Sequence, residues 1–199
     1  MNIFVLHQDP VAAAQMQCDK HVVKMIVESA QMLSTAHRML DGTVQIAPSK
    51  SGKRMVKHYR LFDDPEMDQL LYKAVHYKHP CTVWTMESAQ NYMWHWRHLD
   101  ALCEEYTYRY GKEHGAKENW WIFREPPKNM PSLGKTTPVP QAMKQFPECM
   151  VKDDSVQAYR NFYVVAKKSF ATWKERGRPS WYENMTQNQN DTMIGCSGN

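Results

Sequence analysis

Apolar side chains recur at intervals of three and four residues along most of the chain, and this pattern predicts a protein built mainly of helices. Asp9-Pro10 has the form of an N-cap followed by a proline in the first helical turn. Neither glycine nor a further proline interrupts the sequence as far as Leu40. One long helix is therefore expected over residues 10 to about 40. It ends at Asp41-Gly42, and a polar, basic loop follows as far as Arg54.

Further helix starts divide the rest of the chain. Asp64-Pro65 begins a second predicted helix, which ends near His79-Pro80 because a residue before proline disfavours helical backbone. The longest helix is expected from Pro80 to about residue 114. Residues 126–140 are rich in proline and form an irregular segment that is either functional or wraps the core. Asp153-Asp154-Ser155 caps a final helix with a buried stripe at Tyr159, Tyr163, Ala166, Phe170 and Trp173.

These elements predict an all-α fold, a compact single domain over residues 1–182 with long helices and the irregular proline-rich loop. The polar residues 183–199 offer few side chains to bury, so a disordered C-terminal tail is expected there. A chain of 199 residues is long enough for one substantial core, and its seven Trp and ten Tyr predict that this core is aromatic.

Composition limits the compartment and the partners. No stretch approaches the roughly 18 apolar residues of a membrane span, and the N-terminal segment is too short for a signal peptide. We therefore expect a cytoplasmic protein that does not bind membranes. The five scattered cysteines form no C-x-x-C pair, which favours free thiols over disulfides or a zinc ribbon. A net charge of +4 permits a nucleic-acid partner without requiring one.

One polar stripe lies along the first predicted helix. At 3.6 residues per turn, eight polar positions fall within an arc of about 100°, whereas the rest of the circumference is mostly apolar. These positions are Gln17, Lys20, His21, Lys24, Glu28, Gln31, Thr35 and Arg38. A solvated face with an ordinary Lys24–Glu28 pair would explain the stripe. Alternatively, the stripe lines a cleft in which His21 and Lys24 influence the ionisation of Glu28, a base or electrostatic stabiliser. Periodicity leaves both interpretations open.

Other polar groups suit nucleic acid or metal. His79-Pro80-Cys81 at a helix start favours an anion such as phosphate, or is a simple turn. A C-terminal group mixes cations with aromatic rings, which suits phosphate contacts and base stacking, or forms a strap packed on the core. With Arg38 and His79, the expected nucleic-acid contacts are thus Arg176, Arg178, Trp181 and Tyr182. His95-x-x-His98 lacks a nearby third ligand, so no metal is expected.

Several common catalytic motifs are absent from the sequence, namely the glycine-rich dinucleotide and Walker loops, G-x-S-x-G and H-E-x-x-H. Kinases, dinucleotide-dependent enzymes and serine hydrolases therefore lose their usual support. No cofactor is expected.

Four short pieces carry a resemblance to a known family. The opening Met1-Asn2-Ile3-Phe4-Val5-Leu6-His7, the His-x6-Glu spacing from His21 to Glu28, His76-Tyr77-Lys78-His79-Pro80 and Arg178-Pro179-Ser180-Trp181-Tyr182 follow one another in family order. In them the chain resembles, distantly, the pyrimidine-dimer DNA glycosylases, the endonuclease V-like repair enzymes of phages and bacteria. The resemblance implies a helical fold that inserts into damaged duplex DNA and combines glycosylase with abasic-site lyase chemistry.

By this resemblance, an N-terminal amine attacks the sugar C1′ and a helix glutamate assists departure of the base. Glu28 would be that carboxylate and His21 a neighbour that positions DNA or sugar. Because Asn2 is bulky, we expect Met1 to be retained and its α-amine to be the nucleophile. The arginine that precedes the family's glutamate is Val27 here, which removes an expected phosphate or substrate contact.

Two other functions stay open at this point. A metal-dependent hydrolase that modifies nucleotides or nucleic acids would use His21, Glu28, His95 and His98. A non-catalytic, phage-type accessory factor would bind DNA or a protein, and it would tolerate Glu28→Gln without functional loss.

Overall fold

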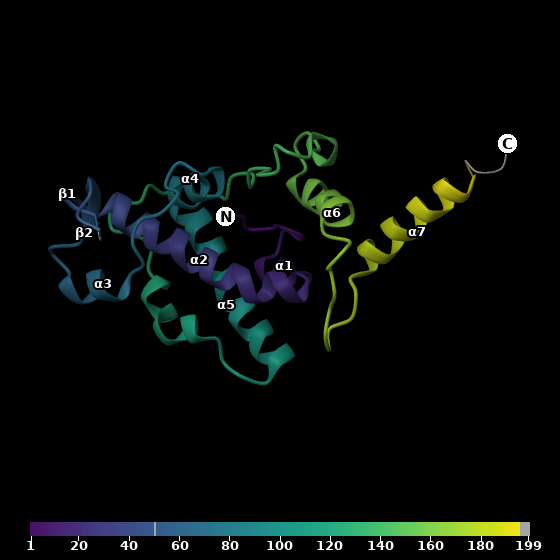
Figure 1. Ribbon diagram of the computed structural model, residues 1–199, viewed down its shortest axis with the longest axis horizontal. Coiled ribbons are helices and arrows are strands. Elements are labelled where there is room, and N and C mark those ends of the chain that lie inside the picture. Colours follow the sequence, from purple (N-terminus) through teal and green to yellow (C-terminus); the bar gives the residue numbers. More distant parts are fainter. Residues whose placement is uncertain (50, 196–199) are drawn as a thin grey trace.

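The structure is a computed structural model that describes residues 1–49 and 51–195 (Figure 1). Helices dominate it, which confirms the helical fold class, and within the described residues a single two-stranded sheet accompanies them. The helices are α1 (Pro10–Gln15), α2 (Asp19–Leu40), α3 (Pro65–Leu70), α4 (Pro80–Glu87), α5 (Ala89–Tyr110), α6 (Ser155–Ala166) and α7 (Ser180–Gly195). The strands are β1 (Thr43–Pro48) and β2 (Met55–Arg60), and two 3-10 helices, η1 (Gly115–Phe123) and η2 (Pro147–Cys149), complete the elements.

The core forms where α2 and α5, each of 22 residues, cross (Figure 1). α1 and α4 also pack on α5 and extend this layer. The N-terminal residues 3–6 are an apolar run that is buried in the core. This segment has no regular structure, and side chains supply its hydrogen bonds: Gln17 Nε2 donates to the Ile3 carbonyl at 2.9 Å and Arg160 Nε to the Leu6 carbonyl at 3.1 Å. The segment therefore carries the N-terminus to the middle of α2.

The predicted helix caps are confirmed, but the first predicted helix is divided. Asp9, Asp64 and Asp154 each accept a hydrogen bond from a backbone N–H in the first turn of α1, α3 and α6. The expectation of one helix over residues 10–40 is wrong, because the helix breaks between Gln15 and Asp19. Residues distant in sequence form hydrogen bonds with the backbone groups freed at this break. Trp173 Nε1 donates to the Met16 carbonyl at 2.9 Å, and the Asp19 N–H donates to the Thr172 carbonyl at 2.8 Å.

The other expected helices are shorter than predicted. α3 ends at Leu70 rather than near His79, and the chain then runs without regular structure to Pro80. The longest predicted helix breaks at Ser88, which has extended backbone and accepts the Asn91 N–H at 3.2 Å as the N-cap of α5. Serine is a favoured N-cap residue, so this break had a sequence signal.

Residues 43–48 and 55–60 form an antiparallel hairpin where a loop was predicted. Val44, Gln45 and Ile46 are in turn apolar, polar and apolar, and this period of two is typical of a strand. Val44 pairs with Tyr59 on the neighbouring strand. The turn uses Gly52 at a φ of 70°, a conformation that glycine adopts without steric cost. The basic loop thus belongs to the tip of a β-ribbon.

The C-terminal residues differ from the expected disordered tail. α7 begins at Ser180 and continues to Gly195, and residues 196–199 of the predicted tail lie outside the described residues. Neither proline nor glycine interrupts residues 180–194, and the first turn packs Tyr182 and Met185 against the core. This docking anchors the start of the helix, because tertiary packing stabilises a helix that its own sequence favours only weakly.

The proline-rich segment wraps α4 and α5. Asn91 on α5 and Thr137 exchange two hydrogen bonds, at 2.9 and 2.8 Å, and Trp84 Nε1 donates to the Thr137 carbonyl at 3.0 Å. Further along, the Ala142 carbonyl accepts a hydrogen bond from Asn2. The irregular segment predicted there is confirmed, and it reaches the N-terminus of the chain.

Candidate amine–carboxylate site

Glu28 lies in the middle of α2 and faces the first residue of the chain. Its Oε2 is 3.7 Å from the α-amine of Met1 and accepts a hydrogen bond from the Asn2 N–H at 3.0 Å. Its Oε1 is 3.1 Å from Lys24 Nζ, one turn earlier on the same helix. The Glu28 side chain is only 14% exposed. The structure therefore brings together three of the four residues predicted to be catalytic, namely Glu28, Lys24 and Met1.

Asn2 fixes the position of the amine. Its Oδ1 accepts the backbone N–H groups of Ile3 at 2.8 Å and Phe4 at 3.3 Å, and its Nδ2 donates to the Ala142 carbonyl at 3.2 Å. The Met1 side chain packs against a small buried cluster that includes Ile3 and Trp84. Because the Met1 side chain and Asn2 are both held in place, the α-amine stays next to Glu28 at little entropic cost. Sequence reasoning missed Asn2, although the apolar run that follows it is a signal for burial.

His79 is the one predicted nucleic-acid residue that lies at this site. Its Nδ1 accepts the Cys81 N–H at 3.2 Å and caps α4. Burial lowers the pKa of His79, and the nearby N-terminal amine and His76 lower it further, opposed by Glu28. The imidazole is thus held as a neutral, polar group beside the amine and the carboxylate.

A cavity of about 370 Å³ shares His79 and Ala142 with the surroundings of the amine, although neither Met1 nor Glu28 lines it. His79 and Pro80 form one wall, and residues 141–146 with Phe162 form the other. Ala142, which holds Asn2, is part of this lining. Phe146 packs against Phe162 with ring centroids 5.1 Å apart, which gives the cavity an aromatic wall. Lys144 and Gln145 are exposed at its lining and bring a cation and an amide.

His21 lies in the core instead of at the carboxylate. Its ring stacks on Phe4 with centroids 4.1 Å apart, and its Nδ1 is 2.5 Å from the Tyr163 hydroxyl. Burial, together with the nearby cations Lys167 and Lys24, lowers its pKa to about 3. The prediction that His21 influences Glu28 or contacts DNA is therefore corrected, because a buried neutral imidazole packs the helix against α6.

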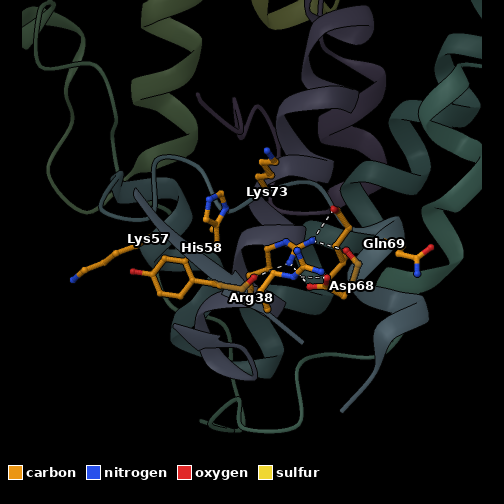
Figure 2. A pocket seen from close by; sticks show the side chains of 10 residues that line it. Arg38, Lys57, His58, Asp68, Gln69 and Lys73 are labelled. Atoms are coloured by element: carbon orange, nitrogen blue, oxygen red, sulfur yellow. Dashed lines mark hydrogen bonds and ion pairs between the residues drawn. The ribbon is translucent and has the colours of Figure 1, made fainter. Parts of the chain in front are cut away.

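Arg38 also has a structural position instead of the expected nucleic-acid contact (Figure 2). Its guanidinium is buried and donates to Asp68 Oδ1 at 2.7 Å and to the carbonyls of Tyr59, Asp68, Leu71 and Tyr72. The guanidinium thereby ties α2 to β2 and α3. All its nitrogens are engaged, so a phosphate has no donor left to approach.

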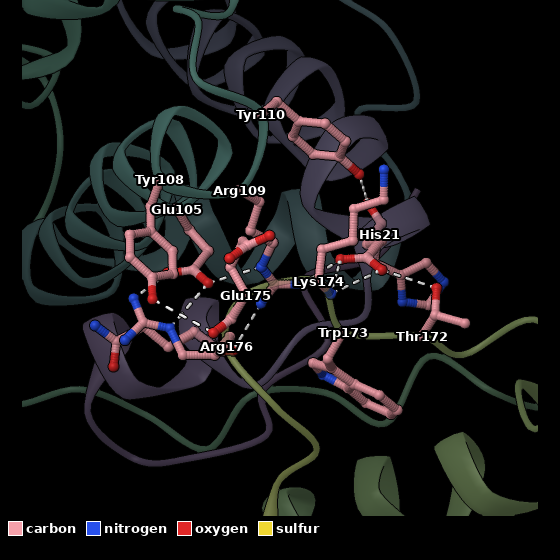
Figure 3. Close-up of polar contacts among 12 residues, drawn as sticks. His21, Glu105, Tyr108, Arg109, Tyr110, Thr172, Trp173, Lys174, Glu175 and Arg176 are labelled. Carbon is pink, nitrogen blue, oxygen red and sulfur yellow. Dashed lines mark hydrogen bonds and ion pairs between the residues drawn. The ribbon is translucent and has the colours of Figure 1, made fainter.

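The C-terminal cations and aromatic rings form a strap, the alternative that the sequence left open. Arg176 Nη2 is 2.7 Å from Glu105 Oε2, and Arg109 bridges Glu105 and Asp19 at 2.7 and 2.9 Å (Figure 3). Tyr182 is buried and packs on Trp173, and the Trp181 ring lies against Tyr163. Arg178 is exposed. Arg176, Trp181 and Tyr182 therefore hold the strap on the helices, which corrects their assignment as DNA contacts.

The two histidines of α5 are fully buried. His95 Nδ1 lies 2.8 Å from Thr85 Oγ1, and His98 lies between the Pro10 carbonyl and Gln17. Burial lowers the pKa of His95 to about 3 and that of His98 to about 4. Among the described residues, no group of three or more His, Cys, Asp or Glu side chains could hold a metal ion.

Within the described ranges, no helix combines the length and apolar character that a membrane crossing needs. Comparison with protein-family models, with curated proteins and with solved structures finds no match to this chain.

Proposed function

We propose that this protein is a DNA glycosylase with abasic-site lyase activity that acts on damaged or modified bases. One observation carries the proposal: the α-amine of Met1 lies 3.7 Å from the carboxylate of Glu28. A primary amine beside a carboxylate is the pair that imine chemistry at a sugar C1′ needs, because one group attacks and the other moves protons. The family resemblance of the sequence assigned these roles to the same two residues.

The reaction begins at C1′ of the sugar and ends with strand cleavage and release of the enzyme. The amine nitrogen attacks C1′, and the bond from C1′ to the base breaks, so that the base leaves with its electron pair. Glu28 accepts the proton that the attacking amine loses and can return it to the sugar ring oxygen as the ring opens to an imine. The same carboxylate then takes a proton from C2′, and elimination releases the 3′ phosphate. Water hydrolyses the imine and restores the Met1 amine.

The cavity lined by His79, Ala142 and Phe146 suits an extruded base. A base-modifying enzyme must take its target out of the helical stack, and such bases stack on aromatic rings and meet polar groups at their edges. Phe146 offers the ring, and Gln145 an exposed amide. Lys144 lies where it can meet a flanking phosphate. These groups support a nucleotide substrate at this position.

Borohydride trapping tests the proposal. The purified protein is incubated with abasic-site and dimer-containing duplexes and borohydride, and the products are read by intact mass and peptide mapping. We expect a covalent adduct on the N-terminal peptide, and we expect acetylation of the α-amine to prevent it. Lys24→Gln keeps the amine and should still form the adduct. No adduct and no strand cleavage would refute the lyase activity and would favour the non-catalytic DNA-binding factor.

A further inference from the structure

The hairpin β1–β2 stands at the edge of the molecule, at the C-terminal end of α2 and beside α3 (Figure 1). Residues 42–62, which include it, and residues 69–86 contain no Asp or Glu, whereas together they contain seven Lys and Arg. Residues 63–68 between them carry Asp63, Asp64, Glu66 and Asp68, so the excess of positive charge belongs to the hairpin and residues 69–86 rather than to α3. A surface with such an excess attracts polyanions.

A pocket of about 380 Å³ lies between the hairpin and α3 (Figure 2). Its one carboxylate, Asp68, is already paired with Arg38 and with Arg60, each at 2.7 Å. Lys57 and Lys73 line the same pocket and are exposed. Figure 2 shows Lys73 and His58 above the Arg38–Asp68 pair and Lys57 extending outwards. The pocket thus keeps an excess of positive charge after its internal pairing.

Residues 71–79 connect this pocket with the amine site. Arg38 donates to the Leu71 and Tyr72 carbonyls, and the Val75 N–H donates to Thr35 Oγ1 at 3.1 Å, so the segment follows α2 back towards Glu28. Lys73, His76 and Lys78 are exposed along it. Glu28 and Arg38 are ten positions apart on α2, or roughly 15 Å along the helix axis. That distance corresponds to about four base pairs of duplex DNA.

The hairpin has a shape that can enter a groove of duplex DNA. A two-stranded ribbon fits the major groove, and apolar side chains on DNA-binding proteins contact sugars and base steps. Val44, Ile46 and Met55 are 50, 62 and 61% exposed on this ribbon. By the ladder register they share one face with Lys57 and Tyr59. An apolar face with a cation on it suits a nucleic-acid groove better than bulk solvent.

We propose that the hairpin β1–β2 and residues 71–79 form the surface that binds the phosphate backbone of duplex DNA, about four base pairs from the nucleotide at the amine site. The choice of DNA rests on the proposed function, but the surface itself is argued from charge and shape. It replaces Arg38, Arg176, Trp181 and Tyr182 as the nucleic-acid contacts of this protein, whereas the exposed Arg178 stays a predicted contact.

The test compares two double charge reversals of equal size. K57E/K73E changes the proposed surface, whereas K112E/K152E changes two exposed lysines elsewhere and lowers the net charge equally. Affinity for an undamaged 20-base-pair duplex is measured by fluorescence anisotropy over a range of salt concentrations. We expect K57E/K73E to lose at least about tenfold in affinity at 100 mM salt and to reduce the salt slope by roughly 1.8. We expect K112E/K152E to change affinity less than threefold.

Equal losses in the two double variants, or no duplex binding by the native chain, would overturn the inference. Displacement of the duplex by ATP at constant ionic strength would also overturn it, since the pocket would then be a nucleotide site. Hairpin-dependent binding without any borohydride adduct would refute only the proposed chemistry, and an adduct with hairpin-independent binding would refute only this surface.

Discussion

Lys24 Nζ lies 3.1 Å from Glu28 Oε1, while Oε2 of the same carboxylate faces the α-amine of Met1. The Lys24 side chain is 69% exposed, so its ion pair contributes no more than a few tenths of a kcal/mol to folding. Its effect is local, because it fixes one carboxylate oxygen and leaves the other for the amine. The two oxygens of Glu28 thus have separate partners, and this division leads to the first prediction.

Glu28→Gln should abolish turnover and leave the fold intact. The amide keeps the shape of the side chain and can still accept the Asn2 N–H, but it cannot accept a proton from the amine. We expect the rate of strand cleavage at an abasic site to fall at least about 100-fold. The urea midpoint should stay unchanged. Glu66→Gln, at an exposed position on α3, is the matched control and should cleave normally. Normal cleavage by Glu28→Gln would remove this carboxylate from the mechanism.

Part of the site could be predicted from the sequence because helical periodicity places Lys24 and Glu28 on one face. The same periodicity assigned His21 and Arg38 to that face, yet both are buried by segments that are distant in sequence. The hydroxyl of Tyr163 satisfies His21, and the carboxylate of Asp68 satisfies Arg38. A polar stripe on a helix does not reveal whether solvent, a cleft or a polar partner faces it.

Caps could be predicted from local sequence, whereas the helix breaks could not all be. Asp9, Asp64 and Asp154 each accept a hydrogen bond from the first turn of the helix that they cap, so the local sequence was enough to identify them. The break before Asp19 depends on hydrogen bonds from residues 172 and 173, more than 150 positions away. The hairpin was missed because its strands are short and mostly exposed, and only the alternation around Val44 signals it.

Arg38→Ala should destabilise the protein strongly. Removal of the guanidinium leaves Asp68 with one partner and leaves four backbone carbonyls unsatisfied at a buried position. The free energy of unfolding in urea should fall by about 3–5 kcal/mol. Arg60→Ala removes the other partner of Asp68, but Arg60 is 49% exposed, so a loss below about 1 kcal/mol is expected. Equal losses in the two variants would contradict the buried role of Arg38.

Arg176→Ala should leave duplex affinity within about twofold of the native value. Its guanidinium donates to Glu105 and lies over the Tyr108 ring, 4.4 Å from the centroid, so a phosphate must compete with this carboxylate for the donors (Figure 3). Anisotropy at two salt concentrations measures the effect. A reduced salt slope in this variant would restore the strap as a DNA contact.

Arg109→Met is the structural contrast, because it leaves both Asp19 and Glu105 short of a buried partner. The free energy of unfolding should fall by about 3–5 kcal/mol.

Four buried histidines predict that the protein loses stability in mild acid. Burial lowers the pKa of His21 and His95 to about 3 and that of His37 and His98 to about 4. The unfolded chain takes up protons near pH 6.5, where the folded chain does not, so stability is full above that pH and falls as the pH decreases towards 4. At pH 5.5 each histidine contributes a loss of roughly 1.4 kcal/mol.

Urea midpoints followed by Trp fluorescence at pH 7.5 and pH 5.5 measure this loss. The range stays above the pH at which ordinary carboxylates titrate, so the histidines dominate the change. His21→Phe keeps a ring stacked on Phe4 and cannot take up a proton, so it should reduce the pH-dependent loss by about a quarter. His76→Asn removes an exposed imidazole at a positive φ, which asparagine tolerates, and is the matched control for the removal of a histidine. An equal pH dependence in His21→Phe and the native chain would mean that His21 is not held neutral in the core.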